Sequence, residues 1–151
     1  MKVVILAGGK GTRIAEYTKE IPKPMIRIGG KPIISRIVNL FQSYKFKEII
    51  IAAGYKSYVL KKYFRNKNKN LKIKVVDTGK NTMTGGRILR LKSYFDKNEN
   101  FFMTYGDGLC SINLDNLIQF HLKHKKIASV TAVHPPVRFG ELEIKGDDVT
   151  K

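Results

Sequence analysis

Short apolar runs alternate with helical patterns along the chain, and this alternation constrains the fold more than any other feature. Residues 3–7 and 49–53 contain only Val, Ile, Leu and Ala, which is typical of strands buried on both faces. We predict further strands at 73–76, 101–104 and 128–133. Helices are predicted at 33–44, 57–64 and 114–124, and another after Gly85 and Gly86 with Ile88, Leu91 and Phe95 on one face. This order predicts an α/β fold with right-handed crossovers and a doubly wound, mainly parallel sheet.

Length and composition exclude several other classes of protein. A chain of 151 residues fits one domain, and its 42% of hydrophobic residues argues against disorder. The longest purely apolar runs are far shorter than the ~20 residues that a membrane-spanning helix needs, so we expect no membrane association. The single cysteine, Cys110, excludes an internal disulfide, and we therefore expect a reducing cytosol and a small packing residue at that position.

The basic charge leaves two interpretations open. The chain has 29 Lys and Arg against 12 Asp and Glu, a net charge of +17, which is compatible with a basic nucleic-acid-binding module. However, 22 of these residues are Lys and 7 are Arg, and Lys-rich composition also follows from A/T-rich codons. The densest basic stretch, residues 61–69, is either a solvated helix end and loop or an anion-binding segment.

A glycine-rich loop follows the first predicted strand. Residues 8–13 read Gly-Gly-Lys-Gly-Thr-Arg, and the N–H groups of such a loop can form a nest for an anion. The loop is not a P-loop, and Ile14 stands where a dinucleotide fingerprint requires its third glycine. Downstream, Pro22 and Pro24 flank Lys23 and would fix the direction of its ammonium group.

These two motifs make the chain resemble the sugar-phosphate nucleotidyltransferases. The cytidylyl-transferring branch of that family is matched more specifically by residues 24–25, 29–33, 54–56, 76–79, 83–87, 104–108 and 135–140. The resemblance implies a Rossmann-like fold of the glycosyltransferase-A-like type, with residues 1–151 forming the nucleotide-binding part of the domain. Family members continue well beyond Lys151 into a second acidic metal ligand and most sugar contacts, so we expect a fold that is incomplete at its C-terminus. The last ten residues are predicted to begin a hairpin.

The resemblance also implies a site at the carboxyl ends of the strands. The expected nucleotide-binding residues are Leu6, Ala7, Gly8, Gly9, Lys10, Gly11, Thr12, Arg13, Lys23, Thr82, Arg87 and Gly106. The expected catalytic residues are Arg13, Lys23 and Asp107, with Lys10 and Arg13 at the leaving pyrophosphate and Lys23 at the α-phosphate.

Two of these segments have alternatives when the residues are considered alone. Asp107 lies between Gly106 and Gly108 at a strand end, where its carboxylate could hold Mg²⁺, but Asp-Gly is also a common turn. Arg87 could donate to a phosphate or carbonyl oxygen, or it could be a surface arginine after a helix-capping turn.

The implied reaction joins CTP to a sugar 1-phosphate, with glucose 1-phosphate as the expected sugar, and gives a CDP-sugar and pyrophosphate. Its expected cofactor is Mg²⁺, with Asp107 as the metal ligand that the resemblance implies, and its expected context is the synthesis of deoxysugars for cell-surface polysaccharide. We expect no specific nucleic acid partner, and whether the protein forms a homo-oligomer is open. A truncated CTP-binding chain without full activity and a basic nucleic-acid-binding module remain the alternatives.

Overall fold

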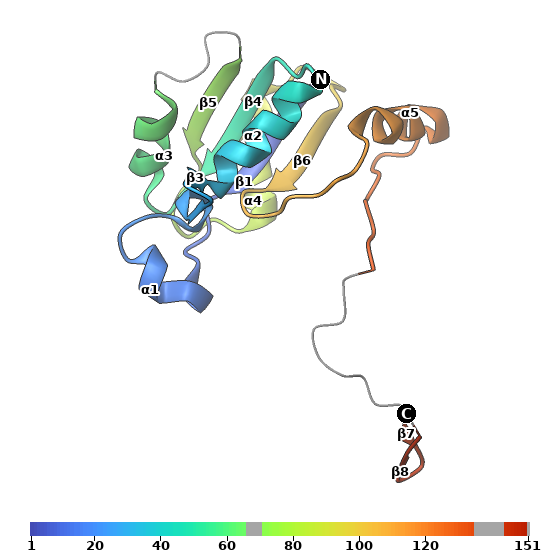
Figure 1. Ribbon diagram of the computed structural model, residues 1–151. Helices are drawn as coiled ribbons and strands as arrows, with labels where there is room; N and C mark the ends of the chain where they lie inside the picture. The colour runs from blue at the N-terminus through green and yellow to red at the C-terminus, as the bar shows by residue number, and fades with distance from the viewer. Residues whose placement is uncertain (66–70, 135–143, 151) are drawn as a thin grey trace. The chain divides into compact units, whose positions relative to one another are not determined.

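The computed structural model describes residues 1–65, 71–134 and 144–150. The chain divides into two compact units, Met1–Ile112 and Asn113–Lys151. The first unit contains a four-stranded parallel sheet in the order β5-β4-β1-β6 (Figure 1). Its strands are β1 (Lys2–Ala7), β4 (Glu48–Ala53), β5 (Lys72–Asp77) and β6 (Phe101–Tyr105). The predicted doubly wound parallel sheet is therefore confirmed.

Helices and short turns connect these strands. The longer helices are α2 (Ile33–Ser43), α3 (Ser57–Phe64) and α4 (Thr84–Leu89). Between β1 and α2 lie the 3-10 turn η1 (Thr12–Ile14), α1 (Ala15–Thr18), the 3-10 turn η2 (Lys23–Met25), and the two-stranded hairpin of β2 (Arg27–Ile28) and β3 (Lys31–Pro32). The hairpin turns at Gly29 and Gly30, which have φ of 56° and 76°, a region that glycine enters without steric cost.

The core lies on both faces of the sheet. On one face, α2 contributes Ile34, Ile37, Val38 and Phe41, all buried, and its Phe41 ring lies 6.0 Å from Phe102 of β6. On the other face, a buried cluster from β1 and β4 packs with Leu91, and with Ile88, Tyr94 and Phe95 from the segment of α4 and the 3-10 turn η3 (Lys92–Tyr94). Burial on both faces explains why β1 and β4 read as continuous apolar runs.

The order of the strands determines where a ligand can bind. From β1 the chain passes to β4 and then to β5 on one side, and it returns to place β6 on the other side of β1. The connections therefore run in opposite directions on the two sides of β1, and the sheet has its switch point between β1 and β6. In an open parallel sheet, ligands bind outside the carboxyl ends of the strands at such a switch point.

The second unit contains α5 (Leu114–His124), capped by the Asn113 side chain, which accepts from the N–H of Asn116 at 3.0 Å. It also contains the antiparallel pair β7 (Ile144–Lys145) and β8 (Asp148–Val149), part of the predicted C-terminal hairpin. The strand predicted at 128–133 is wrong. An apolar run becomes a strand only where another strand pairs with it, and the strands described in this unit pair with each other, so Val130 and Val133 are exposed.

Two smaller predictions are also corrected. The predicted helix after Gly85 and Gly86 begins earlier, at Thr84, and ends at Leu89. Leu91 is fully buried, but it lies between α4 and η3, because a helical spacing marks the inward face whether or not the helix is continuous. Cys110 is exposed rather than packed.

Residues 66–69 of the basic stretch and the segment 135–140, which carries part of the family resemblance, lie outside the described residues. Among the helices that the structure describes, none has the length and apolar character needed to cross a membrane.

Candidate functional site

A pocket of about 270 Å³ lies at the carboxyl ends of the strands, at the switch point between β1 and β6. Four segments that are distant in sequence form it: the end of β1 with the loop after it, the turn η2, the residues from Thr82 into α4, and the end of β6 with the two residues that follow it. Its lining consists of Leu6, Ala7, Gly8, Gly9, Gly11, Lys23, Pro24, Thr82, Met83, Thr84, Arg87, Tyr105, Gly106 and Asp107. The structure thus brings together ten of the thirteen residues that the sequence predicts for the site.

The glycine loop reaches this pocket with a defined backbone path. Gly11 has φ of 66°, and a Cβ placed there would lie 2.8 Å from the Thr18 side chain. Thr18 is buried, and its hydroxyl donates to the carbonyl oxygens of Gly11 and Ile14 at 3.2 and 3.3 Å. These hydrogen bonds hold the loop against α1. The positive φ and the nearby Thr18 side chain together require glycine at position 11.

Lys23 and Asp107 form an ion pair in the pocket. Their Nζ and Oδ2 atoms are 2.5 Å apart, and the two side chains are 42% and 32% exposed. A Cβ at Gly106 would lie 2.9 Å from Pro24 Cγ. The η2 turn that carries Lys23 therefore packs closely against the end of β6. The Pro-Lys-Pro motif thus directs the lysine to the strand end that carries the carboxylate.

Three predicted residues lie apart from this lining, as far as the described residues form it. Lys10, Thr12 and Arg13 are exposed on the loop and on η1, and the pocket is formed without them. Their expected roles at the nucleotide stay predictions. Glycine-loop motifs do not reveal which of their side chains point inward, because the turn geometry decides it.

Arg87 is buried rather than a surface arginine. Its Nη1 donates to Thr78 Oγ1 and the Gly79 carbonyl at 2.8 Å each, and to the Ala53 carbonyl at 3.2 Å. Its Nη2 donates to the Gly8 carbonyl at 2.9 Å. Burial lowers the pKa of the guanidinium from its ordinary value.

Asp77 at the end of β5 organises the neighbouring loop. Its carboxylate accepts from the Ser57 hydroxyl at 2.6 Å and from the N–H of Gly79 at 2.9 Å. The hydrogen bond from Ser57, and then that from Gly79, lower the pKa of Asp77, since both stabilise its charged form. The carboxylate thereby joins the start of α3 to the loop after β5.

The sequence prediction missed four residues of the lining: Pro24, Met83, Thr84 and Tyr105. Each adjoins a predicted residue or segment, so the signal was present in the motifs. Met83 and Tyr105 are 81% and 56% exposed. Their apolar surface at the pocket would be covered by a ligand with an aromatic or apolar part.

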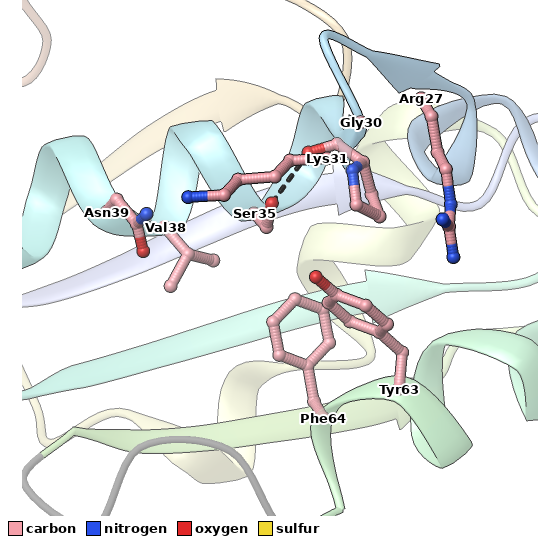
Figure 2. Close-up of a pocket in the computed structure, with 9 residues that line it drawn as sticks. Arg27, Gly30, Lys31, Ser35, Val38, Asn39, Tyr63 and Phe64 are labelled. Atoms are coloured by element: carbon pink, nitrogen blue, oxygen red, sulfur yellow. Dashed lines mark hydrogen bonds between the residues drawn. The ribbon is translucent and has the colours of Figure 1, made fainter.

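A second pocket, of about 350 Å³, lies between α2 and α3 beside the β2–β3 hairpin. In Figure 2, Arg27 and Lys31 lie toward α2 and the hairpin, opposite Tyr63 and Phe64 of α3. Ser35 donates to the Pro32 carbonyl at 2.8 Å. The described residues of this lining include no carboxylate and lie away from the switch point, so the first pocket is the better candidate for phosphate and cation chemistry.

The first pocket offers few protein ligands for a metal ion. Asp107 is the carboxylate among its described lining residues, and the described part of the chain contains no group of three or more His, Cys, Asp or Glu side chains placed to hold a metal. Mg²⁺ is commonly held by one or two carboxylates together with substrate phosphates and water. The residues therefore fit a cation shared with a bound phosphate rather than a cage made by the protein alone.

The chain is similar in sequence to known proteins along almost its whole length. The profile of the nucleotidyl transferase family matches residues 2–151. Glucose-1-phosphate cytidylyltransferase of Salmonella typhimurium is 42% identical over 171 aligned positions, covering 99% of this chain and 66% of that protein. The probable glucose-1-phosphate cytidylyltransferase of Bacillus subtilis is 41% identical, covering 96% of this chain and 65% of that protein.

Solved structures give the same fold. HddC from Yersinia pseudotuberculosis, complexed with GMP-PN, matches with a TM-score of 0.68 and 31% identity over 80% of this chain and 54% of that one. A UDP-glucose pyrophosphorylase complexed with UDP-glucose matches with a TM-score of 0.71 and 25% identity, over 82% and 54%. The chain spans about two thirds of the length of these curated relatives and just over half of the solved chains.

Proposed function

The chain belongs to the nucleotidyl transferase family, and on that premise we propose that it transfers a cytidylyl group from CTP to glucose 1-phosphate. The observation that carries the proposal is the pocket in which the glycine loop, Lys23 and Asp107 meet at the switch point of the sheet. The choice of CTP and glucose 1-phosphate rests on the 42% identity to the cytidylyltransferase of Salmonella typhimurium.

The reaction requires little covalent chemistry from the protein. A phosphate oxygen of the sugar phosphate attacks the α-phosphorus of CTP in line, the bond from that phosphorus to the oxygen bridging the β-phosphate breaks, and pyrophosphate leaves with the electron pair. Positioning and neutralisation of charge then account for most of the rate. The backbone N–H groups of residues 8–12 hold the phosphates, Lys10 and Arg13 neutralise the pyrophosphate, and Lys23 binds the α-phosphate.

Asp107 is the proposed ligand of Mg²⁺. The cation, when bound, supplies positive charge at the reacting phosphate oxygens. The Asp107 carboxylate, at the end of β6 beside the glycine loop, would hold it there; without a ligand, the same carboxylate pairs with another cation, the Lys23 ammonium. Lys23 would turn from this pair to a phosphate of the nucleotide. Because the pair is partly exposed, its separation costs little.

The nucleoside is proposed to lie along the part of the pocket formed by Thr82, Met83 and Tyr105. The exposed surfaces of Met83 and Tyr105 suit the flat faces of a base and a ribose, and the Thr82 hydroxyl can donate to or accept from the polar edge of the base.

The test is a calorimetric titration with CTP, ATP, GTP and UTP, each with and without Mg²⁺. CTP with Mg²⁺ is expected to bind most tightly. Equal affinities would refute the assignment of the base, and absence of binding by all four would refute the function. Pyrophosphate release from CTP and glucose 1-phosphate then tests turnover; binding of CTP without release would identify the chain as a CTP-binding unit only.

The second candidate, a basic nucleic-acid-binding module, is favoured by the net charge of +17. Filter binding of DNA and RNA at two salt concentrations distinguishes it. Affinity that rests on counterion release alone falls steeply with salt, and this is the result we expect. Tight binding that resists salt and depends on sequence would favour the second candidate instead.

A further inference from the structure

The guanidinium of Arg87 joins three loops that leave the sheet at its carboxyl edge. Its acceptors are the carbonyl of Gly8 after β1, the carbonyl of Ala53 at the end of β4, and Thr78 and Gly79 after β5. The residue itself belongs to α4, which follows the same edge. One side chain therefore connects α4 to the loop after β1, the end of β4 and the loop after β5.

We propose that Arg87 is a positioning residue: it fixes the Gly8 carbonyl and so sets the path of the glycine loop that receives the phosphates. The proposal rests on the proposed function in that it takes these phosphates to be those of a nucleotide. It differs from the role expected from the sequence, in which Arg87 donates directly to the nucleotide.

The first support is that the Gly8 carbonyl is held from two sides. It accepts from Arg87 Nη2 at 2.9 Å and from the N–H of Tyr55 at 3.1 Å. With its oxygen held away by these donors, the loop has little freedom to turn its peptide planes. The N–H groups of the following residues are then arranged before a ligand arrives, which lowers the cost of binding.

The second support is steric. A Cβ at Gly8 would lie 2.1 Å from both Cζ and Nη1 of Arg87, and a Cβ at Gly54 would lie 2.5 Å from Nη1. Both glycines lie outside the left-handed region of φ, so their backbone conformation alone does not require glycine. The guanidinium occupies the space that side chains at positions 8 and 54 would need.

The third support is the burial of the charge itself. A buried charge is costly unless hydrogen bonds satisfy it, and the acceptors of Arg87 are the neutral oxygens of three carbonyls and the Thr78 hydroxyl. Asp77 acts on the guanidinium electrostatically and favours its charged form, whereas Arg90 disfavours it. A planar fork with several donors fits this set of divergent acceptors, whereas the compact ammonium of lysine does not.

Arg90 provides a matched control. It follows directly on α4, is exposed, and donates from Nη1 to the Thr78 carbonyl at 2.8 Å. It thus binds the loop after β5, and among the described residues it makes no hydrogen bond to the glycine loop. Arg87→Lys and Arg90→Lys both keep the net charge and remove one guanidinium fork.

The experiment measures amide exchange by NMR in the nucleotide-free protein. The reporter is the N–H of Tyr55, which donates to the Gly8 carbonyl, and the reference is the N–H of Phe46, which donates to the Phe41 carbonyl at 3.2 Å. Arg87→Lys is expected to speed exchange at Tyr55 by about tenfold or more, as expected when a charge-assisted hydrogen bond is lost, with Phe46 unchanged. Arg90→Lys should leave both rates as in the unmodified protein.

The same variants are then titrated with CTP. A displaced loop should weaken the affinity of Arg87→Lys by about 10- to 100-fold, the scale of misplacements of about 1 Å, and leave Arg90→Lys near the unmodified value. If Arg87→Lys binds CTP normally and protects Tyr55 normally, the positioning role is refuted. If it loses CTP affinity with Tyr55 protected as before, Arg87 contacts the nucleotide directly and the proposal is also refuted.

Failure of the proposed function would look different. If the unmodified protein binds none of the nucleotides but Arg87→Lys still speeds exchange at Tyr55, the loop is positioned by Arg87 and the nucleotide assignment alone falls.

Two glycine variants that keep Arg87 cover the case in which Arg87→Lys does not fold. Gly8→Ala, whose Cβ would lie 2.1 Å from the guanidinium, should lower the thermal midpoint strongly and speed exchange at Tyr55. Gly9→Ala is the control, since the described residues place no atom within 4 Å of a Cβ at Gly9. Equal effects of Gly8→Ala and Gly9→Ala would refute the steric part of the proposal.

Discussion

Replacing Asp107 by Asn is expected to separate the metal from the nucleotide while leaving the fold intact. Among the described residues, its carboxylate pairs with Lys23, at 2.5 Å. At that distance two unit charges attract by about 1–2 kcal/mol at the dielectric constant of water. With side chains 42% and 32% exposed, the pair should retain about 0.2–1 kcal/mol of this. Asp107→Asn should therefore lower the free energy of unfolding by less than about 1 kcal/mol.

The effect on nucleotide binding has opposite signs with and without the metal. Without Mg²⁺, the Asp107 carboxylate repels a triphosphate and holds Lys23 away from it. Its removal should leave the affinity for CTP unchanged or raise it by up to about fivefold, which corresponds to about 1 kcal/mol. With Mg²⁺, the variant lacks the anionic oxygen that the cation requires, and the gain in affinity from adding the metal should disappear.

The assay is calorimetric titration of CTP with and without Mg²⁺, together with urea unfolding. Asp96→Asn is the matched control: it removes the same charge from an exposed residue on the chain just before β6, at the opposite edge of the sheet from the pocket. Asp77→Asn is a poorer control, because the Asp77 carboxylate bonds to Ser57 and Gly79. A metal-dependent gain that survives in Asp107→Asn would show that Asp107 is only a turn residue.

Three further changes test the core, the acid stability and the glycine loop. Ile51→Ala, at a fully buried position in β4, should cost about 2–5 kcal/mol in urea unfolding; a loss below 1 kcal/mol would contradict the assigned core. The pKa of Asp77 is lowered in the folded state, so its ionised carboxylate stabilises the fold above the unfolded pKa, and this stabilisation is lost as the pH falls below 3.8. Asp77→Asn should therefore make the free energy of unfolding fall less steeply at acid pH. An unchanged dependence on pH would contradict a stabilising role of Asp77. Gly9→Ala should leave the thermal midpoint unchanged or slightly raised but weaken the affinity for CTP by about tenfold or more, because the added methyl group crowds the bound phosphates. An unchanged affinity would show that the phosphates lie elsewhere.

Most of the fold was predictable because its elements have local causes. The runs at β1 and β4 are continuous and apolar since these central strands are covered on both faces, and α3 and α5 have the predicted bounds. The strand predicted at 128–133 failed for a non-local reason. Whether an apolar run forms a strand depends on a neighbouring strand to pair with, and periodicity carries no information about that neighbour.

The candidate site divides in the same way. The glycine loop, the Pro-Lys-Pro motif and the Gly-Asp-Gly turn are each recognisable within a few residues of sequence. Their contacts are not: the pair of Lys23 with Asp107 and the bond from Arg87 to Gly8 join segments that only the sheet order brings together. The family resemblance therefore predicts Arg87 as a ligand contact, whereas its hydrogen bonds in the structure are to the protein backbone and Thr78.

The three glycines of the loop illustrate how a motif can combine separate requirements. Gly11 is needed for its φ of 66°, and Gly8 leaves space for the guanidinium of Arg87. Gly9 meets neither requirement, because its φ lies outside the left-handed region and a Cβ there has open space among the described residues. It is exposed and lines the pocket. The structure of the protein alone thus explains two of the glycines, and close approach of a ligand to the backbone is the requirement left for the third.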